Sequence, residues 1–244
     1  MPDAPLPAVL IPGLQADGSA WLAQAGAFDR TVVVPGGYHR AGTIDAMARA
    51  VEPDLPPRFH LVGWSMGGYV ALAMAERSAR RIASLALVAT TARDERGAPR
   101  PGRAEAVTRA RAIGMRRYQA EVLRACFADP ARLRDPPARA MIDAAERLGA
   151  DALAAQIAAV VARPDRRAAL PGLAPPTLVL VGERDGVIPP PLSRELATAI
   201  PGARLEVVAD AGHCLPAERP EVVNPLLAAW FARHDGPRHR GAQS

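Results

Sequence analysis

The chain has 244 residues, of which 49% are hydrophobic, and carries a net charge of +5 supplied by arginine alone. This length and hydrophobic content are enough for a sizeable buried core in a single enzyme-sized domain. Only 4% of the residues are aromatic. The basic residues form no stripe interleaved with aromatic side chains, so we expect no nucleic-acid binding.

Membrane insertion and secretion are not expected either. No apolar run approaches the ~18 residues of a membrane-spanning helix, and the N-terminus lacks the pattern of a signal peptide. The two cysteines, Cys126 and Cys214, suggest no disulfide framework, and no metal-ligand spacing is visible. We therefore expect a cytoplasmic protein that uses neither a metal nor an organic cofactor.

Short apolar runs alternate with helical stretches along the chain. The runs begin near residues 8, 31, 59, 84, 177 and 204. This alternation predicts an α/β fold with a doubly wound, mostly parallel sheet. We predict a core formed by residues 1–90 and 174–232, a helical cap formed by residues 91–173, and a mobile tail from 233 to 244.

The first predicted strand, Ala8 to Ile11, is followed by the loop Pro12 to Gly18. Gly13 in this loop permits close approach of another backbone. Taken alone, the loop is an ordinary strand-to-helix turn.

The third apolar run leads into the pentad Gly63-Trp64-Ser65-Met66-Gly67, which a helical pattern follows from Gly68. A strand, a sharp glycine-flanked turn and a helix form a nucleophile elbow, which exposes the serine hydroxyl above a sheet. The free N–H groups of the following helix favour negative charge at that point. Composition alone produces such a pentad in roughly one chain in twenty-five. We therefore predict that Ser65 is a nucleophile.

The segment from Thr91 to Leu173 is predicted to form cap helices around residues 103–127, 137–148 and 151–161. Five apolar cap residues are candidates to face a substrate pocket: Leu123, Phe127, Met141, Leu148 and Ile157. Packing of the cap on the core is the alternative explanation for each of them. A closed apolar cap excludes water and favours acyl groups with hydrocarbon character.

Two late strands each precede a candidate partner for Ser65. Asp185 comes four residues after the strand ending at Val181, and His213 comes five residues after Val208. The order serine, acid, histidine is the one that a nucleophile elbow fold uses. We predict that His213 is the general base and Asp185 its orienting acid. Glu183 and Asp210 are the alternative acids.

An oxyanion hole needs two backbone N–H donors. The residue after the nucleophile, Met66, is one predicted donor, and Leu14 in the loop after the first strand is the other. Trp64, Leu123 and Phe127 are the predicted substrate-binding side chains.

With these motifs the chain resembles the α/β-hydrolases, within an esterase-like bacterial branch similar to the pimeloyl-carrier-protein methyl ester carboxylesterases. The shared motifs are Leu10-Ile11-Pro12-Gly13-Leu14, the elbow through Gly68, Leu180-Val181-Gly182-Glu183-Arg184-Asp185, and Ala211-Gly212-His213. Many relatives have His-Gly where this chain has Pro12-Gly13. Many also have an Asp-Arg-Gly-His-Gly-like loop after the second strand, which is not present here.

The resemblance and the motifs together predict a serine esterase that acts on a small-molecule carboxylic ester through an acyl-enzyme. A thioesterase acting on coenzyme A or carrier-bound substrates, a lactonase and a C–C hydrolase use the same residues. A hydrolase-fold ligand-binding protein without turnover is a further alternative. The arginines of the first cap helices also suggest docking of an acidic acyl carrier protein: Arg93, Arg96, Arg100, Arg103, Arg109, Arg111, Arg116, Arg117 and Arg124.

Overall fold

A computed structural model describes residues 4–95 and 102–236 of the chain. Within these residues a single sheet is built from β1 (Ala8–Ile11), β2 (Val32–Val33), β3 (Phe59–Trp64), β4 (Ile82–Val88), β5 (Thr177–Gly182) and β6 (Arg204–Val208). The strand order is β2-β1-β3-β4-β5-β6, and every neighbouring pair is parallel. The predicted α/β fold with a mostly parallel sheet is therefore confirmed.

The central strands are buried on both faces, as their uninterrupted apolar sequences require. Successive side chains of β1 alternate between two hydrophobic clusters, with Val9 and Ile11 in one and Ala8 and Leu10 in the other. Because side chains of a strand alternate between its faces, the two clusters lie on opposite sides of the sheet. The edge strand β6 is more exposed.

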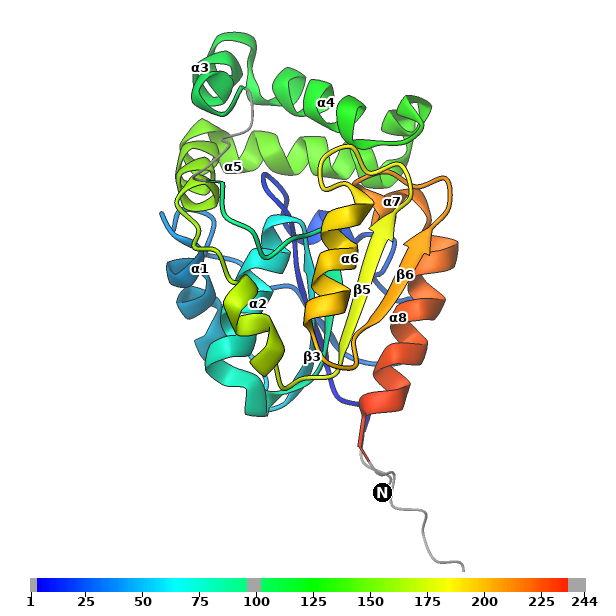
Figure 1. Ribbon diagram of the computed structural model, residues 1–244. Coiled ribbons are helices and arrows are strands. Elements are labelled where there is room, and N and C mark those ends of the chain that lie inside the picture. The colour runs from blue at the N-terminus through cyan, green and yellow to red at the C-terminus, as the bar shows by residue number, and fades with distance from the viewer. Residues whose placement is uncertain (1–3, 96–101, 237–244) are drawn as a thin grey trace, which may run out of the picture.

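Helices cover both faces of the sheet (Figure 1). The helices α1 (Ile44–Val51), α2 (Met66–Ser78) and α6 (Pro190–Ala199) contribute apolar residues to the first cluster, and α7 (Leu215–Glu218) and α8 (Pro220–His234) to the second. Short 3-10 helices lie in the connections between these strands and helices: η1 (Gly18–Trp21), η2 (Glu52–Asp54), η3 (Ala79–Arg81) and η5 (Arg167–Gly172).

A separate group of helices lies above the end of the sheet at which β5 and β6 finish (Figure 1). It consists of α3 (Arg103–Ile113), α4 (Met115–Cys126), η4 (Pro130–Arg134) and α5 (Pro136–Val161). Where one helix was predicted over residues 103–127, Gly114 with φ 83° separates α3 from α4. Gly149 interrupts α5 with non-helical angles, at the break predicted between residues 148 and 151. The division into core and cap remains our prediction.

The last helix, α8, continues into the segment from residue 233 that was predicted to be a mobile tail. It reaches His234, and the following Asp235 is fixed by an ion pair with Arg30. The remainder of the predicted tail, residues 237–244, lies outside the described residues. No helix in the described part of the chain is long and apolar enough to cross a membrane.

Candidate active site

Ser65 occupies a strained turn between β3 and α2. Its φ of 56° and ψ of −117° are sparsely populated for a residue with a side chain. The surrounding backbone fixes this conformation, because the Ser65 N–H donates to the Val88 carbonyl and the Thr90 hydroxyl donates to the Ser65 carbonyl, both at 2.9 Å. The turn therefore has the geometry predicted for a nucleophile elbow.

The glycine two residues after Ser65 lets the helix begin directly against the sheet. A Cβ on Gly67 would lie 2.1 Å from the Ile11 carbonyl oxygen, so no other residue fits without backbone movement. This close contact places the first turn of α2 next to the loop that follows β1. Ser65 thus lies where the helix N-terminus and that loop meet.

The structure brings Ser65, His213 and Asp185 into one hydrogen-bonded row. His213 Nε2 lies 2.9 Å from Ser65 Oγ, and His213 Nδ1 lies 2.9 Å from Asp185 Oδ2. Both partners are buried, with exposed fractions of 4% for His213 and 3% for Asp185. In a buried site these hydrogen bonds are stronger than they would be in water.

Backbone contacts hold the histidine and the aspartate in place. The other carboxylate oxygen of Asp185, Oδ1, accepts the N–H groups of Val187 and Ile188, each at 2.8 Å. The His213 N–H donates to the Cys126 carbonyl, and the Trp64 indole donates to the His213 carbonyl, also at 2.8 Å. The alternative acids serve elsewhere: Asp210 pairs with exposed Arg184, and Glu183 accepts the Asp210 N–H.

The two residues predicted to supply oxyanion donors, Leu14 and Met66, line the same cavity as Ser65. Within the described residues, neither N–H is hydrogen-bonded to an acceptor. Their role as oxyanion donors remains our prediction.

The loop after β1 is held by two glutamines that sequence reasoning did not identify. Gln15 has a positive φ of 55°, and its N–H donates to Gln156 Oε1 at 2.8 Å. Gln15 Nε2 donates to the same oxygen at 3.0 Å, and both side chains are fully buried. Since Gln156 belongs to α5, a helix above the sheet fixes the residue next to Leu14. No local motif signals this contact, because the two residues lie 141 positions apart.

Glu218 is a second site residue that the sequence did not reveal. Its buried carboxylate accepts the Ala128 N–H at 2.8 Å and the Gly212 N–H at 3.1 Å. Burial raises the pKa of Glu218, although these backbone hydrogen bonds oppose the rise. The carboxylate therefore joins the segment after α4 to the loop that carries His213.

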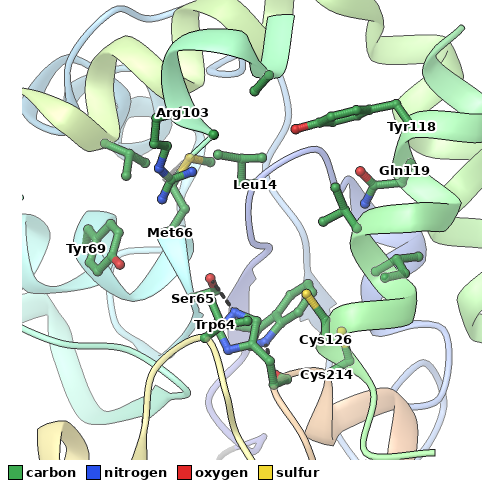
Figure 2. Close-up of a pocket in the computed structure, with 17 residues that line it drawn as sticks. Leu14, Trp64, Ser65, Met66, Tyr69, Arg103, Tyr118, Gln119, Cys126 and Cys214 are labelled. Carbon is green, nitrogen blue, oxygen red and sulfur yellow. Dashed lines mark hydrogen bonds between the residues drawn. The ribbon is translucent and has the colours of Figure 1, made fainter. Parts of the chain in front are cut away.

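A cavity of about 220 Å³ opens above Ser65, and we call it the Ser65 cavity. Its walls are largely apolar and include Trp64, Leu123, Val160 and Val187. Arg103, Tyr118 and Gln119 from α3 and α4 add polar groups on the side away from the sheet (Figure 2). The cavity thus places Ser65 beside a space large enough for a small organic molecule.

Of the predicted substrate-binding residues, Trp64 and Leu123 line the Ser65 cavity. Phe127 is not among the described residues that line it; this residue is buried in the second hydrophobic cluster, where Met141 also packs. Leu148 and Ile157 are partly exposed residues of α5.

Most of the described arginines in the predicted docking group are paired with carboxylates. The pairs include Arg93 with Glu195, Arg103 with Glu95, Arg109 and Arg117 with Glu121, Arg111 with Asp151, and Arg116 with Asp143 and Glu146. Arg96 and Arg100 lie outside the described residues. The paired side chains form a surface of mixed charge rather than a basic patch.

A parallel sheet with a serine elbow after its third strand, flanked by helices on both faces, places the protein among the α/β-hydrolases. The model of the alpha/beta hydrolase family matches residues 8–226, and the chain belongs to that family.

The most similar proteins include esterases and a lactonase. The chain is 30% identical over 220 residues to the pimeloyl-[acyl-carrier protein] methyl ester esterase of Aromatoleum aromaticum, covering 81% of this chain and 84% of that protein. A thermophilic esterase from Thermogutta terrifontis has a TM-score of 0.76 at 30% identity, with 94% of this chain and 90% of that chain covered. The enol-lactonase from Burkholderia xenovorans has a TM-score of 0.80 at 29% identity, with 95% and 92% covered.

Proposed function

We propose that the protein is a serine hydrolase that cleaves small-molecule carboxylic esters through an acyl-enzyme. The observation that carries this proposal is the row Ser65–His213–Asp185, whose serine opens into the Ser65 cavity. A buried base within hydrogen-bond reach of a serine, itself oriented by a third group, is the arrangement that activates a hydroxyl nucleophile.

In the first step, His213 holds its Nδ1 proton toward Asp185 and accepts the Ser65 proton on Nε2. The serine oxygen attacks the ester carbonyl, and the N–H groups of Leu14 and Met66 stabilise the resulting oxyanion. His213 then gives its Nε2 proton to the leaving alcohol, and Asp185 stabilises the imidazolium while it exists. The alcohol departs and leaves the acyl group on Ser65.

In the second step, His213 takes a proton from a water molecule, which attacks the acyl-enzyme carbonyl. The same two N–H groups stabilise the second oxyanion. Collapse of this intermediate returns the proton to Ser65 and releases the carboxylic acid. Both steps use the same row Ser65–His213–Asp185 and the same two N–H groups, with the serine as the first nucleophile and water as the second.

The cavity walls support an acyl group with hydrocarbon character. Leu14, Met66, Leu123 and Val160 provide apolar contacts around the serine, and such contacts favour apolar substrate surface. We favour a free ester over a carrier-linked one because the arginines available for an acidic carrier are largely paired with carboxylates. Lactones and thioesters use the same residues, and one relative is an enol-lactonase.

The test is hydrolysis of p-nitrophenyl acetate, butyrate and octanoate by the wild type and by Ser65→Ala. We expect turnover by the wild type and a loss of about 10⁵-fold or more in the variant, because the nucleophile is removed. The preferred chain length measures how much acyl group the cavity accepts. Equal turnover by both proteins would refute Ser65 as the nucleophile. A folded wild type that hydrolyses none of the esters would refute the proposed substrate class.

A further inference from the structure

Both cysteines of the chain lie in the wall of the Ser65 cavity. Cys126 is the last residue of α4, and Cys214 directly follows His213. Figure 2 shows the two side chains next to each other on one side of the cavity. Both are free thiols; Cys126 is partly exposed, whereas Cys214 is buried. A reagent small enough to enter the cavity therefore meets Cys126 first.

The two chain segments that carry the cysteines are held in tight backbone contact. The His213 N–H donates to the Cys126 carbonyl at 2.8 Å. A Cβ on Gly212 would lie 2.5 Å from that same carbonyl oxygen, so the segments approach as closely as glycine allows. Glu218 bonds to both segments and keeps them together. Formation of a disulfide requires this kind of preformed proximity.

The thiols differ in a way that assigns a role to each. The neighbouring Cys214 thiol lowers the pKa of Cys126, and the nearby His213 lowers that pKa further. Burial raises the pKa of Cys214, and the neighbouring Cys126 adds to the rise. Since the thiolate is the reactive form, Cys126 is the sulfur that attacks first and Cys214 the one that resolves.

We propose that Cys126 and Cys214 form an oxidisable dithiol site, at which a peroxide entering the Ser65 cavity converts the two thiols to a disulfide and stops hydrolysis. The disulfide depends only on the geometry of the two cysteines. Its effect on hydrolysis rests on the proposed function.

The reaction with hydrogen peroxide proceeds in two displacements. The Cys126 sulfur attacks one peroxide oxygen, the O–O bond breaks, and the departing hydroxide takes a proton to become water, which leaves a sulfenic acid. The Cys214 sulfur then attacks the Cys126 sulfur, the S–S bond forms, and the S–O bond breaks with loss of a second water. Two thiols and one peroxide give one disulfide and two waters, so two electrons pass from sulfur to peroxide.

The disulfide stops hydrolysis by displacing His213. A disulfide bond holds its sulfurs about 2.05 Å apart, which is much closer than two unbonded thiols can approach. Cys214 directly follows His213 in the chain. When the Cys126 and Cys214 sulfurs move into bonding distance, His213 therefore moves as well, away from its position beside Ser65 and Asp185. A misplacement of about 1 Å in such a site lowers the rate by about 10²-fold.

The test is treatment of the reduced wild type with hydrogen peroxide, followed by intact-mass measurement and p-nitrophenyl ester hydrolysis. We expect the mass to fall by two hydrogen atoms, turnover to slow at least 10-fold, and both changes to reverse after dithiothreitol. Cys126→Ser and Cys214→Ser, each compared with its own untreated sample, should not lose two hydrogens. Cys214 is buried, so a serine at this position can lower Tm. In that case Cys214→Ala is used in place of Cys214→Ser.

The outcomes separate this proposal from the proposed function. Ser65→Ala should form the same disulfide by mass whether or not the wild type is an esterase. Retention of both free thiols under excess peroxide would overturn the dithiol site, and a disulfide that leaves kcat unchanged would overturn its control of hydrolysis. A loss of activity that dithiothreitol does not reverse, with a gain of one oxygen in mass, would assign the effect to methionine oxidation instead.

Discussion

Asp185 uses its two carboxylate oxygens for different tasks. Oδ1 accepts two backbone N–H groups, whereas Oδ2 is bonded to His213 Nδ1. Because two backbone N–H groups donate to Oδ1, the atom at that position must be a hydrogen-bond acceptor. Under the proposed function, the substitution Asp185→Asn tests this division of labour with almost no change in shape.

In Asp185→Asn the amide oxygen must stay with Val187 and Ile188, so the amide nitrogen occupies the position of Oδ2. That nitrogen donates a proton to His213 Nδ1, which forces the ring proton onto Nε2 and removes the acceptor for Ser65. We expect turnover of p-nitrophenyl butyrate to slow by about 10⁴-fold, the loss that this tautomer error causes in other serine hydrolases.

The matched control is Asp210→Asn, which changes the alternative acid two residues before Gly212. Asp210 is an exposed residue paired with Arg184, and we expect this variant to turn over substrate at the wild-type rate within about a factor of two. Thermal unfolding of both variants shows whether they are folded at the assay temperature. An Asp210→Asn variant that loses activity while Asp185→Asn keeps it would reverse our assignment of the acid.

At the scale of elements, α5 and the loop after β1 act together on the predicted oxyanion hole. Gln156 in α5 accepts two hydrogen bonds from Gln15, whose neighbour Leu14 supplies one proposed donor. In Gln156→Leu, a buried N–H group loses its partner, at a cost of about 1–3 kcal/mol. The loop then shifts to satisfy that group, and we expect kcat to decrease at least 10-fold while KM changes less.

Gln156→Glu supplies the comparison for this positioning role. A glutamate keeps an acceptor at the same place, and we expect it to recover most of the kcat that Gln156→Leu loses. Steady-state kinetics with p-nitrophenyl acetate, split into kcat and KM, measures both variants. If leucine and glutamate lower kcat equally, then the hydrogen bond to Gln15 does not position the loop.

Elements with a strong local pattern were predictable from sequence, and the contacts between them were not. The strands that carry Ser65, Asp185 and His213 were located because buried parallel strands have continuous apolar sequences and end in glycine-containing turns. Gln156 and Glu218 carry no such pattern, since their roles arise only when distant helices meet the loops after β1 and β6. Phe127 was assigned to the pocket from its hydrophobicity, which does not distinguish cavity walls from packed core.

At the scale of the whole molecule, Asp235 near the C-terminal end of the described chain binds Leu6 near its N-terminal end, Arg30, and His60 in the sheet. Its carboxylate accepts two hydrogen bonds from Arg30 and one from the Leu6 N–H, and it bonds to His60 of β3 at 3.1 Å. Both side chains of the pair are nearly buried, with exposed fractions of 7% for Arg30 and 8% for Asp235. The sequence placed Asp235 in a mobile tail because its partners lie 175 or more positions away.

Asp235→Ala removes one partner and leaves the Arg30 charge nearly buried. Breaking a buried ion pair in this way costs about 3–5 kcal/mol. For a chain of this size, each kcal/mol corresponds to a Tm shift of about 2–4 °C, so we expect Tm at pH 7 to fall by about 6 °C or more. Asp151→Ala, which removes an exposed ion pair with Arg111, is the control and should change Tm by less than about 2 °C.

The same contact predicts a pH dependence of stability. Burial acts to raise the pKa of Asp235, but hydrogen bonds from Arg30 and His60 outweigh it and lower the pKa to about 2. Because the folded pKa lies below the unfolded value of about 3.9, this carboxylate stabilises the fold above that value and loses its contribution as pH falls toward 2. The difference in unfolding free energy between wild type and Asp235→Ala should therefore be largest above pH 5 and shrink steadily below pH 4. Urea unfolding over this range measures the difference, and a gap that does not change with pH would show that Asp235 stabilises the fold by packing rather than by its charge.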